Sequence, residues 1–455
     1  MGLTERLKTP ESPPPLTPGV TGPRQTNRHV TLFWEALRTR LHQQLISRLD
    51  LSSIEKLPPE QVTRQLHEII AQLMAEAGDL PLNRSERTTL AAELIDEVTG
   101  LGPLEALLRD TTISDILVNT ANHVYIERDG RLERTNIKFR DNAHLTEIIN
   151  RIVSRVGRRV DESSPMVDAR LPDGSRVNAV IPPLALDGPL LSIRRFGGRP
   201  LRSNDLVAAG SITPHMIGLL GACVAAKVNI LISGGTGSGK TTLMNALSAF
   251  IGEGERIVTI EDAAELQLQQ EHIARMETRP PNVEGKGEVV ARDLVRNALR
   301  MRPDRIIIGE VRGSEVVDML QAMNTGHEGS MTTIHANSPR DALNRLEAMV
   351  SMSGAALSET LLRHTIARSL EIIVQLTRGT DGKRRVTSIS EITGMEGNVI
   401  TLQEIFRFAP QGTSPDGRIT GTYEASGVRP AALEKIARIG VDPVAIARAH
   451  GAAGG

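Results

Sequence analysis

The sequence predicts an α/β protein in which a parallel sheet occupies the second half of the chain. From about residue 201, short apolar or β-branched runs alternate with stretches of helical periodicity, an order typical of a parallel sheet covered by helices. A glycine-rich segment at 234–241 lies between the first of these runs and a helix-like stretch. Before residue 201 the pattern is different, with helical periodicities first and short strands after about residue 100. We therefore expect smaller domains ahead of the sheet.

The length and charge of the chain limit what it can be. At 455 residues it exceeds what one ordinary hydrophobic core holds, so we expect two or three domains. Its 53 basic and 54 acidic residues provide no overall attraction to nucleic acid or anionic lipid. The single cysteine, Cys223, excludes an internal disulfide and a cysteine zinc cluster, and its apolar surroundings predict a buried thiol. No apolar run approaches the roughly 18 residues that a membrane-spanning helix needs.

The first 100 residues are predicted to hold a tail and a helical bundle. Residues 1–28 contain six prolines and few apolar side chains, so they cannot bury enough surface to offset the entropy of ordering. We predict that they are disordered. Within residues 29–100, apolar side chains recur three and four positions apart over 30–49, 60–76 and 84–98, which predicts three packed helices.

Residues 101–197 are predicted to form a separate α+β domain. Short apolar runs bounded by turn residues indicate strands, and residues 142–156 have helical periodicity. The glycines and proline of 197–200 then predict a hinge. The predicted strands are 115–119, a hairpin within 124–139 that turns at Asp129 and Gly130, 177–181 and 190–196.

Residues 198–455 are predicted to form the parallel-sheet domain, with a hairpin-like tail. In such a sheet, ligands bind beyond the carboxyl ends of the strands. The predicted strands are 228–233, 257–260, 305–309 and 330–334, and the tail has strands at 386–393 and 399–408.

The glycine-rich segment fits the pattern GxxxxGK followed by Ser or Thr, in the strand–loop–helix setting that a phosphate-binding loop requires. Its glycines allow several backbone N–H groups and a helix N-terminus to point at one anion, while Lys240 reaches the terminal phosphates and the Thr241 hydroxyl holds Mg²⁺. An accidental match is disfavoured by the flanking elements. The predicted nucleotide-binding residues are Gly235, Thr236, Gly237, Ser238, Gly239, Lys240, Thr241 and Thr242.

Hydrolysis of a phosphoanhydride requires charge neutralisation and a placed water, so carboxylates at the ends of later strands are the next candidates. Glu261 follows the strand at 257–260, and Glu310 follows the strand at 305–309. We favour Glu261 as the general base and Glu310, with Thr241, for Mg²⁺. Because that metal-site residue is usually Asp, Glu310 is expected to act through water. The sequence leaves open which glutamate activates the water, and whether either is only a solvated acid.

A histidine and several arginines complete the predicted site. His335 ends the strand at 330–334 and is a candidate sensor of the γ-phosphate, although a lone histidine is more often a packing residue. Arginines from another domain or subunit commonly neutralise charge in such sites, and a surface ion pair is the alternative for each. The candidates are Arg170, Arg176, Arg194 and Arg195.

Together these residues resemble the secretion and pilus-assembly ATPases of the type II/type IV traffic ATPase superfamily. The segments that carry the resemblance are the phosphate loop, an acidic segment at 259–265, a Walker B segment at 306–310, a histidine segment at 326–336 and an upstream segment at 113–119. The resemblance covers about residues 100–410. The tail at 391–402 and the helical front look most similar to the tight-adherence (Tad) pilus branch, and the single cysteine disfavours branches that carry a four-cysteine zinc insertion.

The resemblance implies a RecA-like nucleotide domain, a PAS-like α+β domain before it, and a homohexameric ring. It also implies ATP and Mg²⁺ as ligands, a location in the cytoplasm at the periphery of the bacterial inner membrane, and pilus platform proteins as partners. The implied catalytic residues are Glu261, Glu310, His335, Arg194, Arg195 and Arg176. The implied function is a motor that hydrolyses ATP to drive pilus assembly, retraction or both, or secretion.

Two other classes of function are weighed against this one. A nucleic-acid translocase or helicase with a RecA-like core would carry a basic stripe with aromatic stacking, but aromatic residues make up only 2% of the chain and its charge is balanced. We therefore expect no nucleic-acid partner. For a guanine-nucleotide switch or a binding-only module, the discriminating feature would be an Asn-Lys-x-Asp segment, and the sequence has no Asn-Lys pair.

Overall fold

The computed structural model describes residues 37–38, 40–45, 47–48, 59–77, 82–128, 130–195, 200–281, 286–354 and 358–451. The chain divides into two compact units, one ending at Arg109 and one beginning at Asp110, and each is described by itself. The predicted tail at 1–28 and the hinge residues 197–199 lie outside the described residues. The boundaries predicted at 100 and 197 therefore stay predictions.

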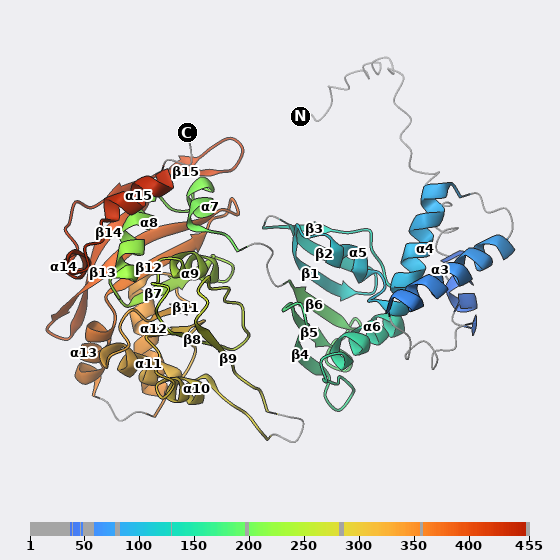
Figure 1. The fold of residues 1–455 in the computed structure, drawn as a ribbon, viewed down its shortest axis with the longest axis horizontal. Helices are drawn as coiled ribbons and strands as arrows, with labels where there is room; N and C mark the ends of the chain where they lie inside the picture. Colours follow the sequence, from blue (N-terminus) through green and yellow to red (C-terminus); the bar gives the residue numbers. More distant parts are fainter. Residues whose placement is uncertain are drawn as a thin grey trace, which may run out of the picture. The chain divides into compact units, whose positions relative to one another are not determined.

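The first unit is helical, and its sequence explains where its best-defined helix begins. The side chain of Asn83 accepts a hydrogen bond from the backbone N–H of Glu86, whose carboxylate accepts one from the N–H of Asn83. This reciprocal cap satisfies two otherwise unpaired donors. Leucines spaced along the helices, such as Leu66, Leu90 and Leu94, are fully buried in a common core. Besides helical residues within 37–48, the unit contains α3 (Pro59–Glu76), α4 (Arg84–Thr99) and α5 (Leu104–Arg109), with α3 and α4 in blue in Figure 1.

The second unit begins with a six-stranded antiparallel sheet in the order β3-β2-β1-β6-β5-β4. Side chains on β6 alternate between exposed and buried, as expected for strands with one covered face. The predicted strands and helix are present here, whereas β4 was not predicted. The elements are β1 (Ile113–Thr120), β2 (His123–Arg128), β3 (Arg131–Arg134), α6 (Asn142–Ser154), β4 (Met166–Arg170), β5 (Arg176–Val180) and β6 (Leu190–Arg194).

A nine-stranded sheet in the order β15-β14-β13-β12-β7-β11-β10-β8-β9 forms the rest of the second unit. The strands from β12 to β9 run parallel, and β13, β14 and β15 continue the sheet as antiparallel hairpins. The strands are β7 (Ile230–Gly234), β8 (Ile257–Glu261), β9 (Ile273–Glu277), β10 (Arg305–Ile308), β11 (Met331–Ile334), β12 (Ile372–Arg378), β13 (Arg384–Glu396), β14 (Val399–Thr413) and β15 (Ile419–Ala425).

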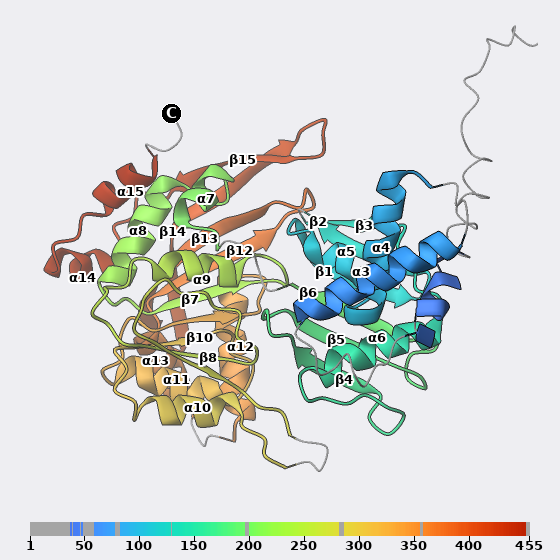
Figure 2. The same ribbon diagram turned by 45° about the vertical axis from the view of Figure 1, so that its right-hand side comes forward.

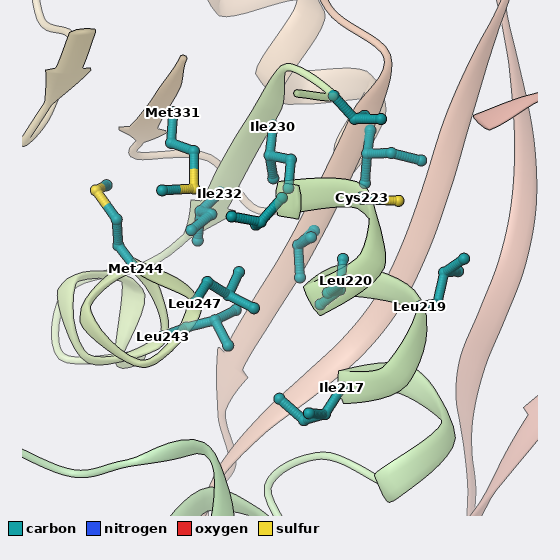
Figure 3. Packing of buried hydrophobic residues seen from close by; sticks show 14 of the residues in the cluster. Ile217, Leu219, Leu220, Cys223, Ile230, Ile232, Leu243, Met244, Leu247 and Met331 are labelled. Atoms are coloured by element: carbon teal, nitrogen blue, oxygen red, sulfur yellow. The ribbon is translucent and has the colours of Figure 1, made fainter. Parts of the chain in front are cut away.

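Helices cover both faces of this sheet (Figures 1 and 2). On β7, Ile230 and Ile232 belong to one hydrophobic core and Leu231 to the other, because successive side chains of a strand point to opposite faces. Figure 3 shows Ile230 and Ile232 packed against two helices of the first face. The first face is covered by α7 (Ser203–Ala208), α8 (Pro214–Ala225), α9 (Lys240–Ser248), α14 (Ala432–Arg438) and α15 (Pro443–Gly451), and the second by α10 (Ala291–Ala298), α11 (Glu315–Asn324), α12 (Pro339–Met352) and α13 (Glu359–Ser369).

This architecture confirms the predicted fold class, an α/β protein with a RecA-like parallel sheet preceded by an α+β region. Cys223 is a buried free thiol in the first core, as predicted, and burial raises its pKa well above the usual range. Among the described residues, no helix has both the length and the apolar character needed to cross a membrane.

Candidate nucleotide site

The phosphate loop follows β7 directly, and its glycines are required by the local geometry. Gly237 and Gly239 have φ angles of 67° and 98°, in the left-handed region that other residues rarely adopt. A Cβ on Gly234 would lie 2.7 Å from the carbonyl oxygen of Leu376. The helix α9 begins at Lys240, immediately after the loop. The turn therefore places a helix N-terminus and loop N–H groups where an anion can bind.

Lys240 lies over the loop. Its Nζ donates hydrogen bonds to the carbonyl oxygens of Gly234, at 2.9 Å, and Gly235, at 3.1 Å. Burial is the main cause that lowers the pKa of the Lys240 ammonium from its usual value. Gly235 is the one predicted loop residue that does not line the adjoining cavity, and it contributes this carbonyl instead.

A cavity of about 260 Å³ lies against the loop and is lined by its residues 236–242. The carboxyl ends of β7, β8, β10 and β11 contribute side chains to it, as expected for a parallel sheet. Besides the loop, the predicted residues that the structure brings together here are Arg176, Arg194, Glu261, Glu310 and His335.

Glu261, the last residue of β8, is 4% exposed. Its Oε1 accepts hydrogen bonds of 2.8 Å from the backbone N–H groups of Glu265 and Leu266, whereas its buried Oε2 has no hydrogen-bond partner among the described residues. Burial raises the pKa of the Glu261 carboxyl to about 7. Gly309 leaves room for this side chain, because a Cβ there would lie 2.9 Å from Glu261 Cγ. A carboxyl group in this setting can accept a proton near neutral pH.

Glu310 is held by an arginine that the sequence analysis did not single out. Arg312 donates to Glu310 at 2.6 Å and to Asp262 at 3.2 Å, so it bridges the segments that follow β10 and β8. In the sequence, the signal available for this role of Arg312 was a positive charge two residues after Glu310. The pair with Asp262 joins residues 50 positions apart, which no local pattern reveals.

The residues present fit Mg²⁺. In phosphate-loop sites the ion takes one or two protein oxygens together with substrate phosphates and water. Thr241, at the start of α9, and Glu310 line the same cavity and provide a hydroxyl and a carboxylate. The described part of the chain holds no cluster of three His, Cys, Asp or Glu residues that could bind a metal.

The histidine segment contributes one of its two histidines to the cavity. His335 follows β11, and desolvation is the largest cause that lowers its pKa, with the charge of Lys240 next. Its ring is therefore mostly neutral at pH 7. His327 does not line the cavity, and its Nδ1 lies 3.0 Å from the carbonyl oxygen of Pro303.

The four candidate arginines have different surroundings. Arg176 forms an ion pair of 3.3 Å with Glu265 at the cavity, and Arg194 lines it with no hydrogen-bond or ion-pair partner among the residues described. Arg195 lines an adjoining cavity of about 470 Å³, and its Nη1 donates to the carbonyl oxygens of Asp110 and Ile113. Arg170 lies outside the loop cavity and pairs with Glu277 at 2.8 Å. The catalytic roles of these residues stay predictions.

Comparison with known proteins finds relatives over most of the chain. A family model described as "Type II/IV secretion system protein" matches residues 97–421. The chain is 40% identical to a putative conjugal transfer protein of Mycobacterium tuberculosis, over 67% of this chain and 87% of that protein. It is 31% identical to the type IV secretion system protein VirB11 of Bartonella quintana, over 64% and 92% respectively. Among solved structures, the VirB11 ATPase of Brucella suis, in complex with sulphate, is 28% identical over 64% of this chain and 95% of that one, with a TM-score of 0.35.

Proposed function

The chain belongs to the type II/IV secretion system protein family, and from this premise we propose that it is a motor ATPase. It hydrolyses ATP with Mg²⁺ at the phosphate loop and uses the free energy to drive pilus assembly, retraction or secretion. The observation that carries the proposal is the environment of the Glu261 carboxyl group. A buried carboxyl group with a pKa of about 7 lies in the same cavity as Lys240 and Thr241.

Binding of the triphosphate is supported by the loop. The N–H groups around Gly237 and Gly239 and the N-terminus of α9 attract the phosphates, and the ammonium of Lys240 adds a full positive charge. Mg²⁺, held by Thr241 and Glu310, neutralises charge on the phosphates when it is bound. Arg312 fixes the carboxylate of Glu310 at the edge of the same cavity.

The position of Glu261 at the cavity supports a role in hydrolysis. Its carboxylate accepts a proton from a water molecule while the water oxygen bonds to the γ-phosphorus and the bond to the leaving ADP oxygen breaks. A base with a pKa near 7 is substantially ionised at neutral pH and still holds the abstracted proton. The N–H groups of Glu265 and Leu266 orient the carboxyl group through Oε1. His335, mostly neutral, is proposed as the sensor of the γ-phosphate.

We also propose a homohexamer at the cytoplasmic face of the inner membrane, with pilus platform proteins as partners and without a nucleic-acid partner. Arg194 and Arg176 line the loop cavity of their own chain, so we propose that each subunit of a head-to-tail ring supplies them to its own nucleotide. The names of the relatives support a role in transfer or secretion, since one is a conjugal transfer protein and another a type IV secretion protein. The single cysteine disfavours branches that carry a four-cysteine zinc insertion, and the tail at 391–402 and the helical front support the Tad branch.

Steady-state ATP hydrolysis by the full chain tests the proposal. Lys240→Ala is expected to lower turnover at least about a hundredfold, because the phosphates lose their buried cation. Lys138→Ala is the matched control, since Lys138 is exposed and outside the cavity. Both variants should retain the melting temperature of the wild type. Equal turnover of a folded Lys240→Ala variant and the wild type would refute the site.

A further inference from the structure

The β12–β13 hairpin extends past the strand that leads into the phosphate loop. β12 runs parallel to β7, and Leu376 lies opposite Gly234, where β7 ends. β12 continues for two more residues, to Arg378, which pairs across the hairpin with Arg384. Since side chains directly opposite on paired strands share a face, two guanidinium groups lie together beside the loop.

The tip of this hairpin is held by an ion pair on a third arginine. Arg385 pairs with Asp381 at 2.7 Å, and the Asp381 side chain is only 2% exposed. The same carboxylate accepts hydrogen bonds from the backbone N–H groups of Lys383 and Ile419, at 3.1 and 3.0 Å. The hairpin is therefore anchored to β15, and the positions of Arg378 and Arg384 are fixed independently of the loop.

Both opposed arginines reach the phosphate loop. The Nε of Arg384 donates to the carbonyl oxygen of Gly237 at 2.9 Å, and the side chain lines the loop cavity. Its two terminal nitrogens have no hydrogen-bond partner among the described residues. Arg378 donates to the carbonyl oxygen of Gly130 and lies 3.6 Å from Glu127, and its Nη1 lies 3.3 Å from where a Cβ on Gly237 would stand.

Fold stability does not account for Arg384, whereas Arg378 has the carboxylate of Glu127 at 3.6 Å. Like charges directly opposite on antiparallel strands are destabilising. Arg385 has a buried carboxylate as its partner, whereas Arg384 has a single bond to a carbonyl. A multiply charged anion on the loop would relieve the repulsion and occupy the unpaired donors of Arg384, which suit phosphate oxygens.

We propose that Arg384 is a phosphate-binding residue of the nucleotide site, supplied by the same chain as the loop, and that Arg378 is a positioning residue. Arg384 donates from its terminal nitrogens to the phosphate chain, while Arg378 keeps the hairpin against the loop and ties both to the turn between β2 and β3. This inference rests on the proposed function, because it takes a nucleoside triphosphate as the ligand.

Equilibrium titration of the full chain with Mg-ATP and with inorganic tripolyphosphate tests the proposal. Arg384→Gln keeps an N–H donor where Nε lies and removes the charge, whereas Arg384→Lys keeps the charge. Arg384→Gln should weaken both ligands about ten- to a hundredfold, the range for a hydrogen bond to a charged group, and Arg384→Lys should weaken them less. Arg418→Gln, at an exposed arginine outside the cavity, is the matched control and should bind as the wild type.

Melting temperatures separate phosphate binding from a structural role. Without ligand, Arg384→Gln should melt at or above the wild-type temperature, and Mg-ATP should stabilise it less. The same titration and melting curves are recorded for Arg378→Gln and Arg378→Lys. Arg378→Gln should bind Mg-ATP more weakly than the wild type, and Arg378→Lys should bind it more tightly than Arg378→Gln. The inference would be overturned if Arg384→Gln bound both ligands with wild-type affinity. It would also be overturned if Arg384→Gln bound more weakly, melted at a lower temperature and was not rescued by Arg384→Lys. Either result would leave the proposed function intact. A wild-type protein that binds neither ligand would refute the proposed function itself.

Discussion

Two glutamates that follow neighbouring strands differ in what surrounds their carboxyl groups. Glu261 is 4% exposed and has one oxygen without a hydrogen-bond partner among the described residues, whereas Glu310 bonds to Arg312 at 2.6 Å. Burial favours the protonated form of Glu261, and the hydrogen bonds from two backbone N–H groups offset this only in part. This difference supports the proposal that Glu261 transfers the proton and that Glu310 serves the metal.

The first prediction concerns turnover and pH. Because only ionised Glu261 can accept a proton, kcat should rise about tenfold per pH unit below about 7 and level off above it. Glu261→Gln should keep ATP binding and lose both turnover and this rise. Steady-state rates at saturating ATP between pH 5.5 and 8 provide the measurement. A wild-type kcat independent of pH over that range would exclude Glu261 as the base.

The second prediction concerns stability and pH. The pKa of Glu261 is raised from 4.5 to about 7 on folding, so its stabilising contribution is complete below pH 4.5 and is lost as pH rises through 7. Glu261→Gln removes this loss, and should be more stable than the wild type at pH 8 by about 3 kcal/mol at most. The difference should vanish near pH 4.5. Thermal melts at both pH values, with the exposed Glu253→Gln as control, check the sign.

The third prediction separates the two adjacent arginines. Arg194 lines the loop cavity, whereas Arg195 donates to two backbone carbonyls. Arg194→Ala should lower kcat about a thousandfold without changing the melting temperature, as for arginines that act on a transferred phosphoryl group. Arg195→Ala should chiefly lower the melting temperature. If Arg194→Ala turns over ATP at the wild-type rate, an arginine other than Arg194 neutralises the charge.

At the residue scale, the sequence predicts what depends on local spacing. Loop residues from Thr236 to Thr242 line one cavity because the glycines and the strand–loop–helix order determine the geometry nearby. Arg384 could not be predicted in this way, since it contacts Gly237 across 147 residues. Its contact depends on β12 pairing with β7, and that pairing has no local signature.

At the element scale, the buried parallel strands are the most predictable. The predicted strand at 257–260 corresponds to β8 and the strand at 305–309 to β10, because runs of β-branched residues are typical of strands buried on both faces. β9 was not predicted, since its sequence IARME is only half buried and carries charges at the edge of the sheet. β12 was not predicted either, although its first five residues are buried.

The fourth prediction concerns how these elements are joined. Asn229, just before β7, accepts hydrogen bonds from the N–H groups of Gly329 and Ser330 and donates to the carbonyls of Met323 and Ser369. It is 2% exposed, so Asn229→Ala leaves buried backbone groups unpaired and should cost about 2 to 4 kcal/mol.

Urea unfolding of the full chain measures this cost. Asn122→Ala, in an exposed turn, is the matched control and should change stability by less than about 0.5 kcal/mol. An Asn229→Ala variant as stable as the control would show that these hydrogen bonds contribute little.

At the scale of the whole molecule, the proposed ring makes a prediction about mass. Six copies of the 49.3 kDa chain would weigh about 296 kDa. Light scattering after size-exclusion chromatography should detect this species in the presence of a non-hydrolysable ATP analogue and Mg²⁺. Arg194→Ala should form the same ring, because its proposed role is chemical. A monomer under all these conditions would contradict the proposed homohexamer.

The most direct test of the account is equilibrium binding of labelled ATP with Mg²⁺ to the full chain, compared with Lys240→Ala. Saturable binding that approaches one nucleotide per chain, and that is lost in a folded Lys240→Ala variant, is the predicted result. No uptake by correctly folded wild-type protein, or equal uptake by the variant, would contradict a nucleotide site at the phosphate loop.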